Sequence, residues 1–269
     1  MSRLALIGNA CVDRIGGGPP SPGGGVFHGA RAATRIGADV IAVTRCAPTD
    51  RATTIGPLEE LDVPFAYGDG TETTAFSFHY EGDHRVMSVD AVGDPWTPDD
   101  IAGWAAPPLA DARWVLVAGL LRSHFPAPTV AALAGEGRRL LLDAQGIVRV
   151  ARVGPLERNA DIDRAVLAHL AVLKLNEDEG RILAGGLDAA SLLALGVPEV
   201  VLTLGSDGAR IVTPEVDAAI PPHPVAATNP TGAGDAFSLV YLDGRESGLS
   251  PVRAAERASR EVATMLADA

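Results

Sequence analysis

The chain has 269 residues, of which 47% are hydrophobic and 21% charged, and its formal net charge is −12 at pH 7. An acidic surface disfavours nucleic acids and anionic membranes as partners, although an anionic nucleotide can still bind through local backbone amides and a metal ion. The two cysteines, Cys11 and Cys46, are too few for a disulfide framework or a zinc cluster, and no apolar run is long enough to cross a membrane. We therefore expect residues 1–269 to form one soluble, cytoplasmic domain.

Short apolar runs alternate along the chain with patterns typical of helices, and the runs end near Gly, Asp, Asn or Thr, as buried parallel strands do. The expected strands are Leu4–Ile7, Val40–Val43, Trp114–Ala118, Leu140–Leu142, Val172–Leu175 and Val200–Leu204. The expected helices are Val26–Ile36, Pro98–Trp104, Thr129–Gly135, Asp161–Leu170, Glu177–Ala184, Leu187–Leu195 and Pro251–Leu266. This order predicts an α/β fold, a doubly wound and mostly parallel sheet with helices on both faces and ligands at the carboxyl ends of its strands.

The glycine- and proline-rich tract Gly16–Gly25 lies between the first expected strand and the first expected helix. It matches neither the dinucleotide-binding Gly-x-Gly-x-x-Gly pattern nor a Walker A loop, because the only lysine of the chain is Lys174. Dehydrogenases of the Rossmann type and P-loop enzymes are therefore disfavoured. A flexible linker is one interpretation of the tract, but a close approach of backbone to a ligand better explains glycines at this place.

One segment departs from the alternation of strands and helices. Residues Thr73–Tyr80 and His84–Val89 both alternate with a period of two, and Glu81-Gly82-Asp83 supplies a turn between them. This predicts a β-hairpin, within about residues 65–92, which is too small to fold alone and which we expect to form a lid over the substrate. A pair of antiparallel edge strands is the alternative. An exposed apolar face on the hairpin would also allow a homodimer.

The most informative stretch is Asn229–Asp235, which precedes the apolar run Ala236–Leu242 and so predicts a loop that feeds a buried helix. Gly232, Ala233 and Gly234 leave backbone N–H groups unobstructed at the start of that helix, where the helix dipole favours an anion. Asp235 follows directly and could take a proton from an attacking hydroxyl group. The alternative is an ordinary acidic residue in the first turn of a helix.

The sequence Thr231-Gly232-Ala233-Gly234-Asp235 resembles the signature of the ribokinase-like (pfkB) carbohydrate kinases. The resemblance implies that the amides of Gly232, Ala233 and Gly234 hold the transferring phosphate and that Asp235 is the catalytic base. It implies a kinase that uses ATP and Mg²⁺ to phosphorylate a hydroxyl group of a small molecule.

Further segments resemble this family in the family's order. They are Gly8–Asp13, Gly23–Gly37, Lys174–Glu179 and Val201–Ile211. The resemblance implies that Asn176 and Glu179 organise magnesium through water, although an Asn-capped acidic helix start explains the same residues. The implied substrate-binding residues are Asn9, Asp13, Gly24, Gly25, His28 and Gln145. The implied nucleotide-binding residues are Lys174, Asn176, Glu179, Thr203, Gly205, Gly208 and Thr231.

The substrate class is narrowed by Asp143–Arg149, which reads Asp-Ala-Gln-Gly-Ile-Val-Arg and looks like the myo-inositol kinase branch of the family. A polyol is therefore favoured as the acceptor. A nucleoside is the second choice, because only 4% of the residues are aromatic. A catalytically silent binding module is a third interpretation. The intact Asp235 argues against it, because a protein that only binds needs no such carboxylate.

Three departures from the family pattern stand out. His28 replaces the usual Asn, and Asn229 replaces a frequent Asp. The chain also ends soon after its last expected helix, which implies a shortened segment near the adenine of ATP.

Overall fold

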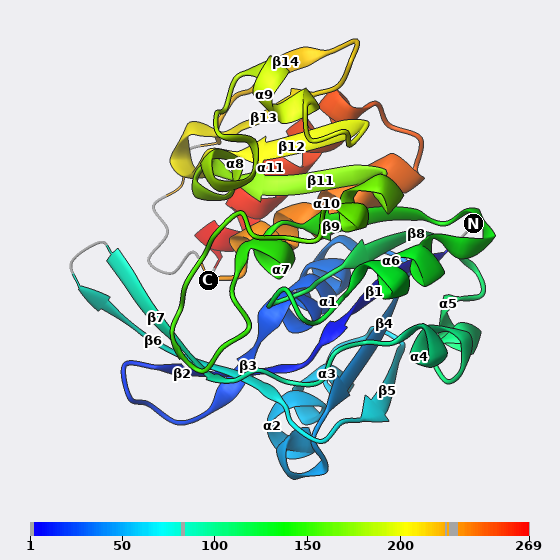
Figure 1. Cartoon of the computed structure of the whole chain (residues 1–269), viewed down its shortest axis with the longest axis vertical. Helices are drawn as coiled ribbons and strands as arrows, with labels where there is room; N and C mark the ends of the chain where they lie inside the picture. The colour runs from blue at the N-terminus through cyan, green and yellow to red at the C-terminus, as the bar shows by residue number, and fades with distance from the viewer. Residues whose placement is uncertain (1–2, 82–83, 224, 226–230, 269) are drawn as a thin grey trace.

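The computed structural model of the protein describes residues 3–81, 84–223, 225 and 231–268 (Figure 1). Its main sheet has nine strands in the order β14-β13-β12-β11-β9-β8-β1-β4-β5. Neighbouring strands are parallel from β12 through to β5, and β13 is antiparallel to both of its neighbours, β12 and β14. The strands are β1 (Arg3–Asn9), β4 (Val40–Cys46), β5 (Phe65–Asp69), β8 (Ala112–Val117), β9 (Arg139–Asp143), β11 (Val172–Asn176), β12 (Glu199–Thr203), β13 (Ala209–Val212) and β14 (Asp217–Ile220). The predicted α/β class and mostly parallel sheet are confirmed, and each of the six predicted strands overlaps one of these.

A second sheet of five strands, which we call the lid sheet, has the order β10-β7-β6-β2-β3. Its strands are β2 (Cys11–Ile15), β3 (Ser21–Gly23), β6 (Thr74–Glu81), β7 (His84–Ala91) and β10 (Gly154–Pro155). The predicted hairpin is therefore present as β6 and β7, with Ser77 opposite Ser88, although Gly82 and Asp83 of its turn lie outside the described residues. In Figure 1 these two strands extend beyond the body of the protein.

The lid sheet corrects two expectations from the sequence. The range given for the lid, residues 65–92, is too wide at its start, because β5 pairs in parallel with β4 at the edge of the main sheet. The tract Gly16–Gly25 also contains a strand, β3, which pairs with β2. Neither short strand has the apolar run by which the central strands were predicted.

Two layers of helices cover the main sheet, because the side chains of each strand alternate between its faces. Leu4 and Leu6 of β1 face one core, which includes α1 (Gly24–Ile36), α10 (Ala233–Glu246) and α11 (Pro251–Ala267). Ala5 and Ile7 face the opposite core. The helices of that second core are α4 (Pro98–Ala102), α5 (Ala106–Leu109), α6 (Ala127–Ala134), α8 (Glu177–Ala184) and α9 (Ala189–Leu193). The shorter helices α2 (Arg51–Thr54), α3 (Gly56–Glu59) and α7 (Gln145–Val148) lie in connections, as do the 3₁₀ helices η1 (Pro48–Asp50), η2 (Gly135–Gly137), η3 (Arg164–His169) and η4 (Gly205–Asp207).

Two helices differ from their predicted form. The helix expected at 161–170 is the 3₁₀ helix η3, which starts where the Asp163 side chain accepts the backbone N–H of Ala165. Helix α10 continues beyond the apolar run Ala236–Leu242, passes through Gly244 and ends at Glu246. A Cβ atom at Gly244 would lie 3.0 Å from the Cβ of Ala254, so this glycine permits close packing of α10 on α11 instead of ending the helix.

The junction of the two sheets determines where a site can form. Strand β1 lies between β4 and β8, where the two halves of the main sheet meet. Ligand sites of such sheets form beyond the carboxyl ends of the strands at this point. Only Ala10 separates β1 from β2, so the lid sheet begins at that same edge. Among the described residues, no helix combines the length and apolar character needed to cross a lipid bilayer.

Candidate active site

A cavity of about 60 Å³ lies between the lid sheet and the loops at the carboxyl ends of the central strands. Its lining comes from the lid sheet, the start of α1, the loop after β8, the α7 region and the start of α10. The lining residues are Cys11, Asp13, Gly24, His28, Phe76, Met87, Leu120, Gln145, Arg149, Thr231, Gly232 and Asp235. Segments far apart in the sequence therefore meet here, and most of the polar ones are residues that the sequence predicted.

Asp235 lies in the first turn of α10 and faces this cavity. Burial raises the pKa of its carboxyl group to about 6, and the negative charge of Asp143 adds to the rise, while Lys174 and Arg149 oppose it. The Gln145 amide Nε2 donates to Asp235 Oδ1 at 3.5 Å. A carboxylate with a pKa near 6 is ionised at neutral pH and is still basic enough to take a proton.

The anion hole, which we define as the backbone N–H groups of Gly232, Ala233 and Gly234, forms the start of α10. Gly232 has a φ of 81°, and a Cβ atom on it would lie 2.5 Å from the imidazole ring of His28, so only glycine fits. The first N–H groups of a helix have no acceptor inside the helix, and Gly232 has no side chain to cap them. These donors are therefore available to an anion.

Lys174 places a positive charge at the anion hole. Its Nζ donates to Asp143 Oδ2 at 2.8 Å, and a Cβ atom on Gly234 would lie only 3.1 Å from Nζ. Burial opposes the charged form of this lysine, but Asp143 and Glu179 outweigh it and raise its pKa. The ammonium group thus stays charged in the interior, directly behind the amides that would hold a phosphate.

Asn176 and Glu179 form a capping box at the start of α8. Asn176 Oδ1 accepts the N–H of Glu179 at 2.9 Å, and Glu179 Oε2 accepts the N–H of Asn176 at 2.8 Å. Burial and the charge of Asp143 raise the pKa of Glu179. No group of three or more His, Cys, Asp or Glu side chains in the described part of the chain is arranged to hold a metal ion directly. The oxygen donors of these two residues nevertheless suit Mg²⁺ contacted through water.

Of the predicted substrate-binding residues, Asp13, Gly24, His28 and Gln145 line the cavity, and Asn9 does not. Asn9 is fully engaged elsewhere, because its Nδ2 donates to the carbonyl oxygen of Asp94 and its Oδ1 accepts the indole N–H of Trp96, each at 2.8 Å. The structure thus gives Asn9 a structural role that its place at the end of β1 did not reveal.

Gly25, another predicted substrate-binding residue, lies behind the cavity wall. A Cβ atom at this position would come within 3.1 Å of Asp235 Oδ1 and 2.8 Å of the Cβ of Ala118. Its missing side chain therefore allows α1 to start close to the base. The approach of the Gly16–Gly25 backbone to a ligand stays a prediction.

The predicted nucleotide-binding residues other than Lys174, Asn176 and Glu179 lie in two places. Thr231 lines the cavity, whereas Thr203, Gly205 and Gly208 lie at the turn between β12 and β13. Thr203 Oγ1 donates to the carbonyl oxygen of Leu175 at 3.2 Å. Gly208 has a φ of 94°, and a Cβ atom on it would lie 2.2 Å from the carbonyl oxygen of Ile220. The φ angle of Gly208 and its closeness to Ile220 explain why this turn has a glycine at position 208.

Five lining residues were not among the predicted site residues: Cys11, Phe76, Met87, Leu120 and Arg149. Phe76 and Met87 come from the two strands of the hairpin. The alternating pattern that predicted the hairpin could therefore also have indicated which of its side chains face the cavity. Arg149 ends the motif Asp143–Arg149 but was given no role of its own. Asn229 and Pro230, at the start of the most informative stretch, lie outside the described residues.

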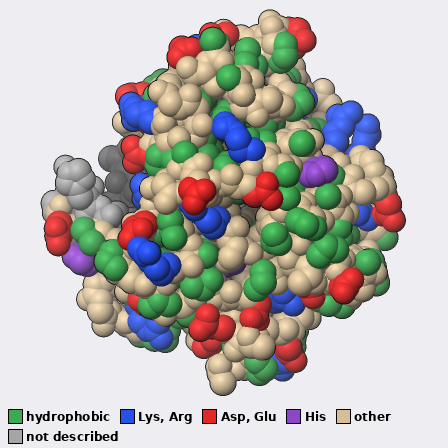
Figure 2. All heavy atoms as spheres, viewed as in Figure 1, with side chains coloured by type: hydrophobic (Ala, Val, Ile, Leu, Met, Phe, Trp, Pro, Cys, Tyr) green, Lys and Arg blue, Asp and Glu red, His purple; other side chains and the backbone are tan. Residues whose placement is uncertain are grey.

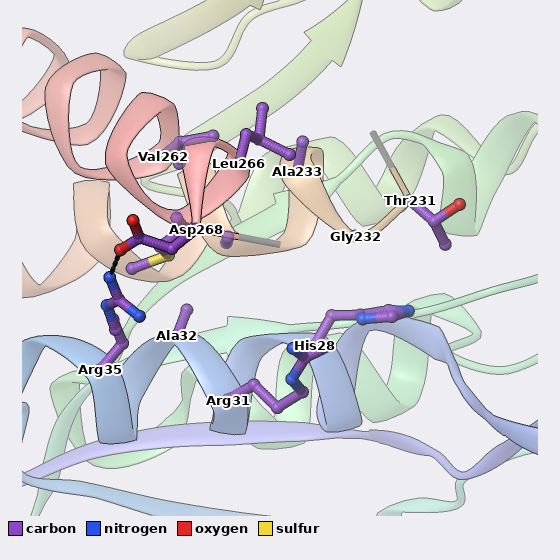
Figure 3. A pocket seen from close by; sticks show the side chains of 12 residues that line it. His28, Arg31, Ala32, Arg35, Thr231, Gly232, Ala233, Val262, Leu266 and Asp268 are labelled. Carbon is purple, nitrogen blue, oxygen red and sulfur yellow. Dashed lines mark hydrogen bonds and ion pairs between the residues drawn. The ribbon is translucent and has the colours of Figure 1, made fainter. Parts of the chain in front are cut away.

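A second cavity, of about 160 Å³, lies on the other side of the turn Thr231–Gly232, between α1, α10 and α11 (Figure 3). His28, Thr231 and Gly232 line both cavities. Figure 3 shows His28 and Arg31 projecting from α1, and Arg35 paired with Asp268 near the end of α11. The turn that begins the anion hole therefore borders both cavities.

Residues 22–266 match the model of the pfkB family carbohydrate kinases. The chain belongs to the pfkB family of carbohydrate kinases. The expected resemblance is thereby confirmed over nearly the whole length of the chain, and the protein is a kinase of this family.

Individual relatives agree with this assignment. The chain is 27% identical to a ribokinase of Bacillus subtilis (strain 168) over 249 residues, which are 91% of this chain and 80% of that protein. It is 31% identical to an inositol 3-kinase of Oryza sativa subsp. japonica over 183 residues, which are 64% of this chain but 42% of that protein. A solved pyrophosphate-dependent kinase of the ribokinase family, complexed with a pyrophosphate analogue and myo-inositol, superposes with a TM-score of 0.81 at 21% identity. That match covers 98% of this chain and 94% of the other, and it shows the common fold.

Proposed function

We propose that this pfkB kinase transfers the terminal phosphoryl group of ATP to a hydroxyl group of a small neutral polyol, with a myo-inositol-like cyclitol as the favoured acceptor. One observation carries the proposal. The Asp235 carboxylate, whose pKa burial raises to about 6, lies directly behind the anion hole and faces the cavity under the lid sheet. A phosphate site and a base for an alcohol are the two groups that phosphoryl transfer to a hydroxyl requires.

In the proposed reaction, Asp13, His28 and Gln145 bind the acceptor's hydroxyl groups. Asp235 takes the proton of the attacking hydroxyl while the new phosphorus–oxygen bond forms and the bond from phosphorus to the leaving oxygen of the donor breaks. The anion hole and Lys174 hold the phosphoryl oxygens in this step. Mg²⁺, when bound, neutralises charge on the donor phosphates, and Asn176 and Glu179 are the residues that would hold it through water.

The chemistry of the cavity supports a neutral and compact acceptor. Asp13 and Asp235 can accept hydrogen bonds from hydroxyl groups and would repel an acid. Phe76 and the smaller imidazole of His28 are the aromatic rings among the described lining residues, so a nucleoside base has little to stack on. The inositol kinase among the relatives and the bound myo-inositol in the solved neighbour favour a cyclitol, and buried polar groups would reject acceptors that leave them unpaired.

Pyrophosphate is the second candidate for the donor. Two observations favour it: the pyrophosphate dependence of the solved neighbour, and the purely structural contacts of Thr203 and Gly208 at the turn expected to face the nucleotide. Both donors present a terminal phosphoryl group to the same anion hole. The proposed roles of Asp235 and Lys174 therefore do not depend on the choice between them.

We also propose that the lid sheet covers the acceptor and excludes water, which would limit hydrolysis of the donor. Phe76 and Met87, from β6 and β7, support this role because they line the cavity. A homodimer through this sheet remains a prediction. Ile15 and Val86 are its exposed large apolar side chains in the described residues, at 42% and 39% exposure, and sedimentation of the wild type and of Ile15→Ser/Val86→Ser would test it.

The experiment that tests the function supplies ATP or pyrophosphate to the purified protein with inositols, pentoses, hexoses and nucleosides in turn, and measures the phosphorylated product by mass. We expect product with a cyclitol, and none from Asp235→Asn on the same timescale. A folded wild-type protein that binds a donor or an acceptor but phosphorylates nothing from either donor would instead be a silent binding module of the same fold.

A further inference from the structure

We infer that Arg149 is a further catalytic residue, whose guanidinium group holds the transferring phosphoryl group from the side of the lid while Lys174 holds it from the interior. This inference rests on the proposed kinase function and adds to it a residue that contacts the reacting group.

The backbone of Arg149 is held firmly at the end of α7. Its N–H donates to the carbonyl oxygen of Gln145 at 3.3 Å, and its own carbonyl oxygen accepts the N–H of Arg122 at 3.0 Å. The Arg122 guanidinium in turn binds the carbonyl oxygen of Val148 at 3.0 Å and Oδ1 of Asn159 at 2.7 Å. The chain therefore presents the Arg149 side chain from a fixed point beside Gln145, which itself contacts the base.

The side chain of Arg149 lies between the body of the protein and the lid. It is half-buried and lines the same cavity as Asp235. Its Cζ is 5.9 Å from the centroid of the Phe76 ring on β6, a cation–π distance. A cation that is covered by a lid residue and opens onto the base is shielded from water on one side, so its interaction with an anion in the cavity is strengthened.

The balance of charges explains why a second cation is needed. Burial raises the pKa of Asp235, which lines the same cavity, and the positive charges of Lys174 and Arg149 both oppose this rise. The charge of Lys174 is already shared with Asp143 at 2.8 Å. An incoming phosphoryl group would therefore meet uncompensated carboxylates unless Arg149 also faces it.

The geometry of a guanidinium group fits this task better than acceptor binding. Its planar donors can bind two oxygens of one phosphoryl group, whereas a neutral polyol offers no charge for it to pair with. The same residue would link catalysis to lid closure, because Phe76 covers the guanidinium from the lid.

The test compares Arg149→Gln and Arg149→Lys with a matched control, Arg152→Gln, whose arginine is exposed and pairs with Glu157. Steady-state kinetics with the best acceptor should show that Arg149→Gln lowers kcat by about 10²–10³-fold with little change in the acceptor KM. Arg149→Lys should recover only part of the loss, because an ammonium lacks the planar pair of donors. Added guanidinium chloride should partly restore Arg149→Gly, and Arg152→Gln should behave as the wild type.

Calorimetric titration with inorganic pyrophosphate provides a readout that does not require turnover. We expect wild type and Arg152→Gln to bind it and Arg149→Gln to bind it at least about tenfold more weakly, as loss of a charge-assisted pair implies. A raised acceptor KM with unchanged kcat, or unchanged pyrophosphate binding in Arg149→Gln, would overturn the inference. If the wild type binds pyrophosphate through Arg149 yet phosphorylates no acceptor, the proposed function fails while the phosphate contact stands.

Discussion

Lys174 and Asp143 face one another across the parallel strands β11 and β9, and the lysine Nζ lies 2.8 Å from the carboxylate Oδ2. The two residues are 6% and 4% exposed, so their charges are almost fully removed from water. The pair keeps the lysine charged and directs it toward Gly234 of the anion hole. The only lysine of the chain therefore lies both in the interior of the sheet and next to the proposed phosphate site.

This pairing predicts that the two roles of Lys174 can be separated. Lys174→Met alone should destabilise the protein by about 3–5 kcal/mol, because it leaves the buried charge of Asp143 unpaired. In the double variant Lys174→Met/Asp143→Leu most of that stability should return, while the donor KM stays high and the acceptor KM changes little. Urea unfolding and steady-state kinetics measure the two effects. A double variant with the wild-type donor KM would show that Lys174 is needed for structure alone.

Replacing the proposed base tests the mechanism. Asp235→Asn keeps the size of the side chain but removes its ability to take a proton, so kcat should fall by about 10²–10⁴-fold. Removal of a negative charge next to the anion hole should leave donor binding intact or slightly tighter. Product formation is measured in single-turnover experiments, with circular dichroism to confirm the fold. Near wild-type turnover by this variant would make Asp235 an ordinary residue of a first helical turn.

The rate should depend on pH through Asp235. With a pKa of about 6, this carboxyl group is protonated in mild acid and cannot act as a base, so kcat/KM should rise with pH up to about 6 and then level off. Asp13 is one of the groups that raise this pKa, so Asp13→Asn should move the rise to lower pH even though it weakens acceptor binding. A rise at the same pH in both proteins would assign the titration to another group.

The ionisation of Asp235 should also change the stability of the protein, and in the direction opposite to its effect on the rate. The folded protein holds the proton of Asp235 more tightly than the unfolded chain does, so ionisation between about pH 4 and pH 6 lowers the free energy of unfolding. Asp235→Asn should therefore be more stable than wild type at pH 8, by roughly 1–2 kcal/mol because the carboxylate faces an open cavity, and not at pH 4. Denaturant titrations at the two pH values measure this difference.

His124 predicts a second pH effect, at the base of the lid. The ring is fully buried, and burial lowers its pKa to about 4, partly offset by its hydrogen bond to Val92. The N–H of Leu120 donates to Nδ1 at 3.2 Å, so Nε2 carries the proton and donates to the carbonyl oxygen of Val92 at 2.7 Å. The neutral ring thus connects a cavity-lining loop to the end of the hairpin.

Because the unfolded chain binds a proton at His124 more readily, stability should be lost as the pH falls from about 6.5 to about 4, by at most about 3 kcal/mol from this residue. His124→Gln supplies a similar donor and acceptor but does not titrate, so its unfolding free energy should fall less over that range. Parallel curves for the two proteins would contradict a neutral His124 in the folded state.

The central strands could be predicted from the sequence because each is a continuous apolar run, buried on both faces. Strands β13 and β14 were missed because they are short and partly polar, and they form only by pairing antiparallel to β12. The predicted helix at 161–170 has the right residue for a helix start at Asp163, but its six helical residues, Arg164–His169, form a 3₁₀ helix and not a regular α-helix.

Some residues of the candidate site could likewise be predicted from the sequence, and others could not. The anion hole and Asp235 are consecutive residues, so their chemistry is local and visible in the sequence. Arg149 and Phe76 meet only because the lid sheet folds over the body, and no pattern in either segment indicates the other. Asn9 is the opposite case. Its position at the end of a strand suggested a ligand contact, but its Oδ1 accepts a hydrogen bond from Trp96, which lies far along the chain.

The packing of α10 and α11 on the first strand also affects when this protein can fold during its synthesis on the ribosome. The residues of α10 are synthesised long after those of β1, yet Leu239 and Val240 are buried in the core that also contains Leu4 of the first strand. A nascent chain without α10 and α11 would leave the apolar face of β1, β8 and β9 that these helices cover exposed, so we expect this core to form only after both helices have been synthesised. Because Asp235 is on that same helix, the proposed base enters the protein together with the helix that completes the core.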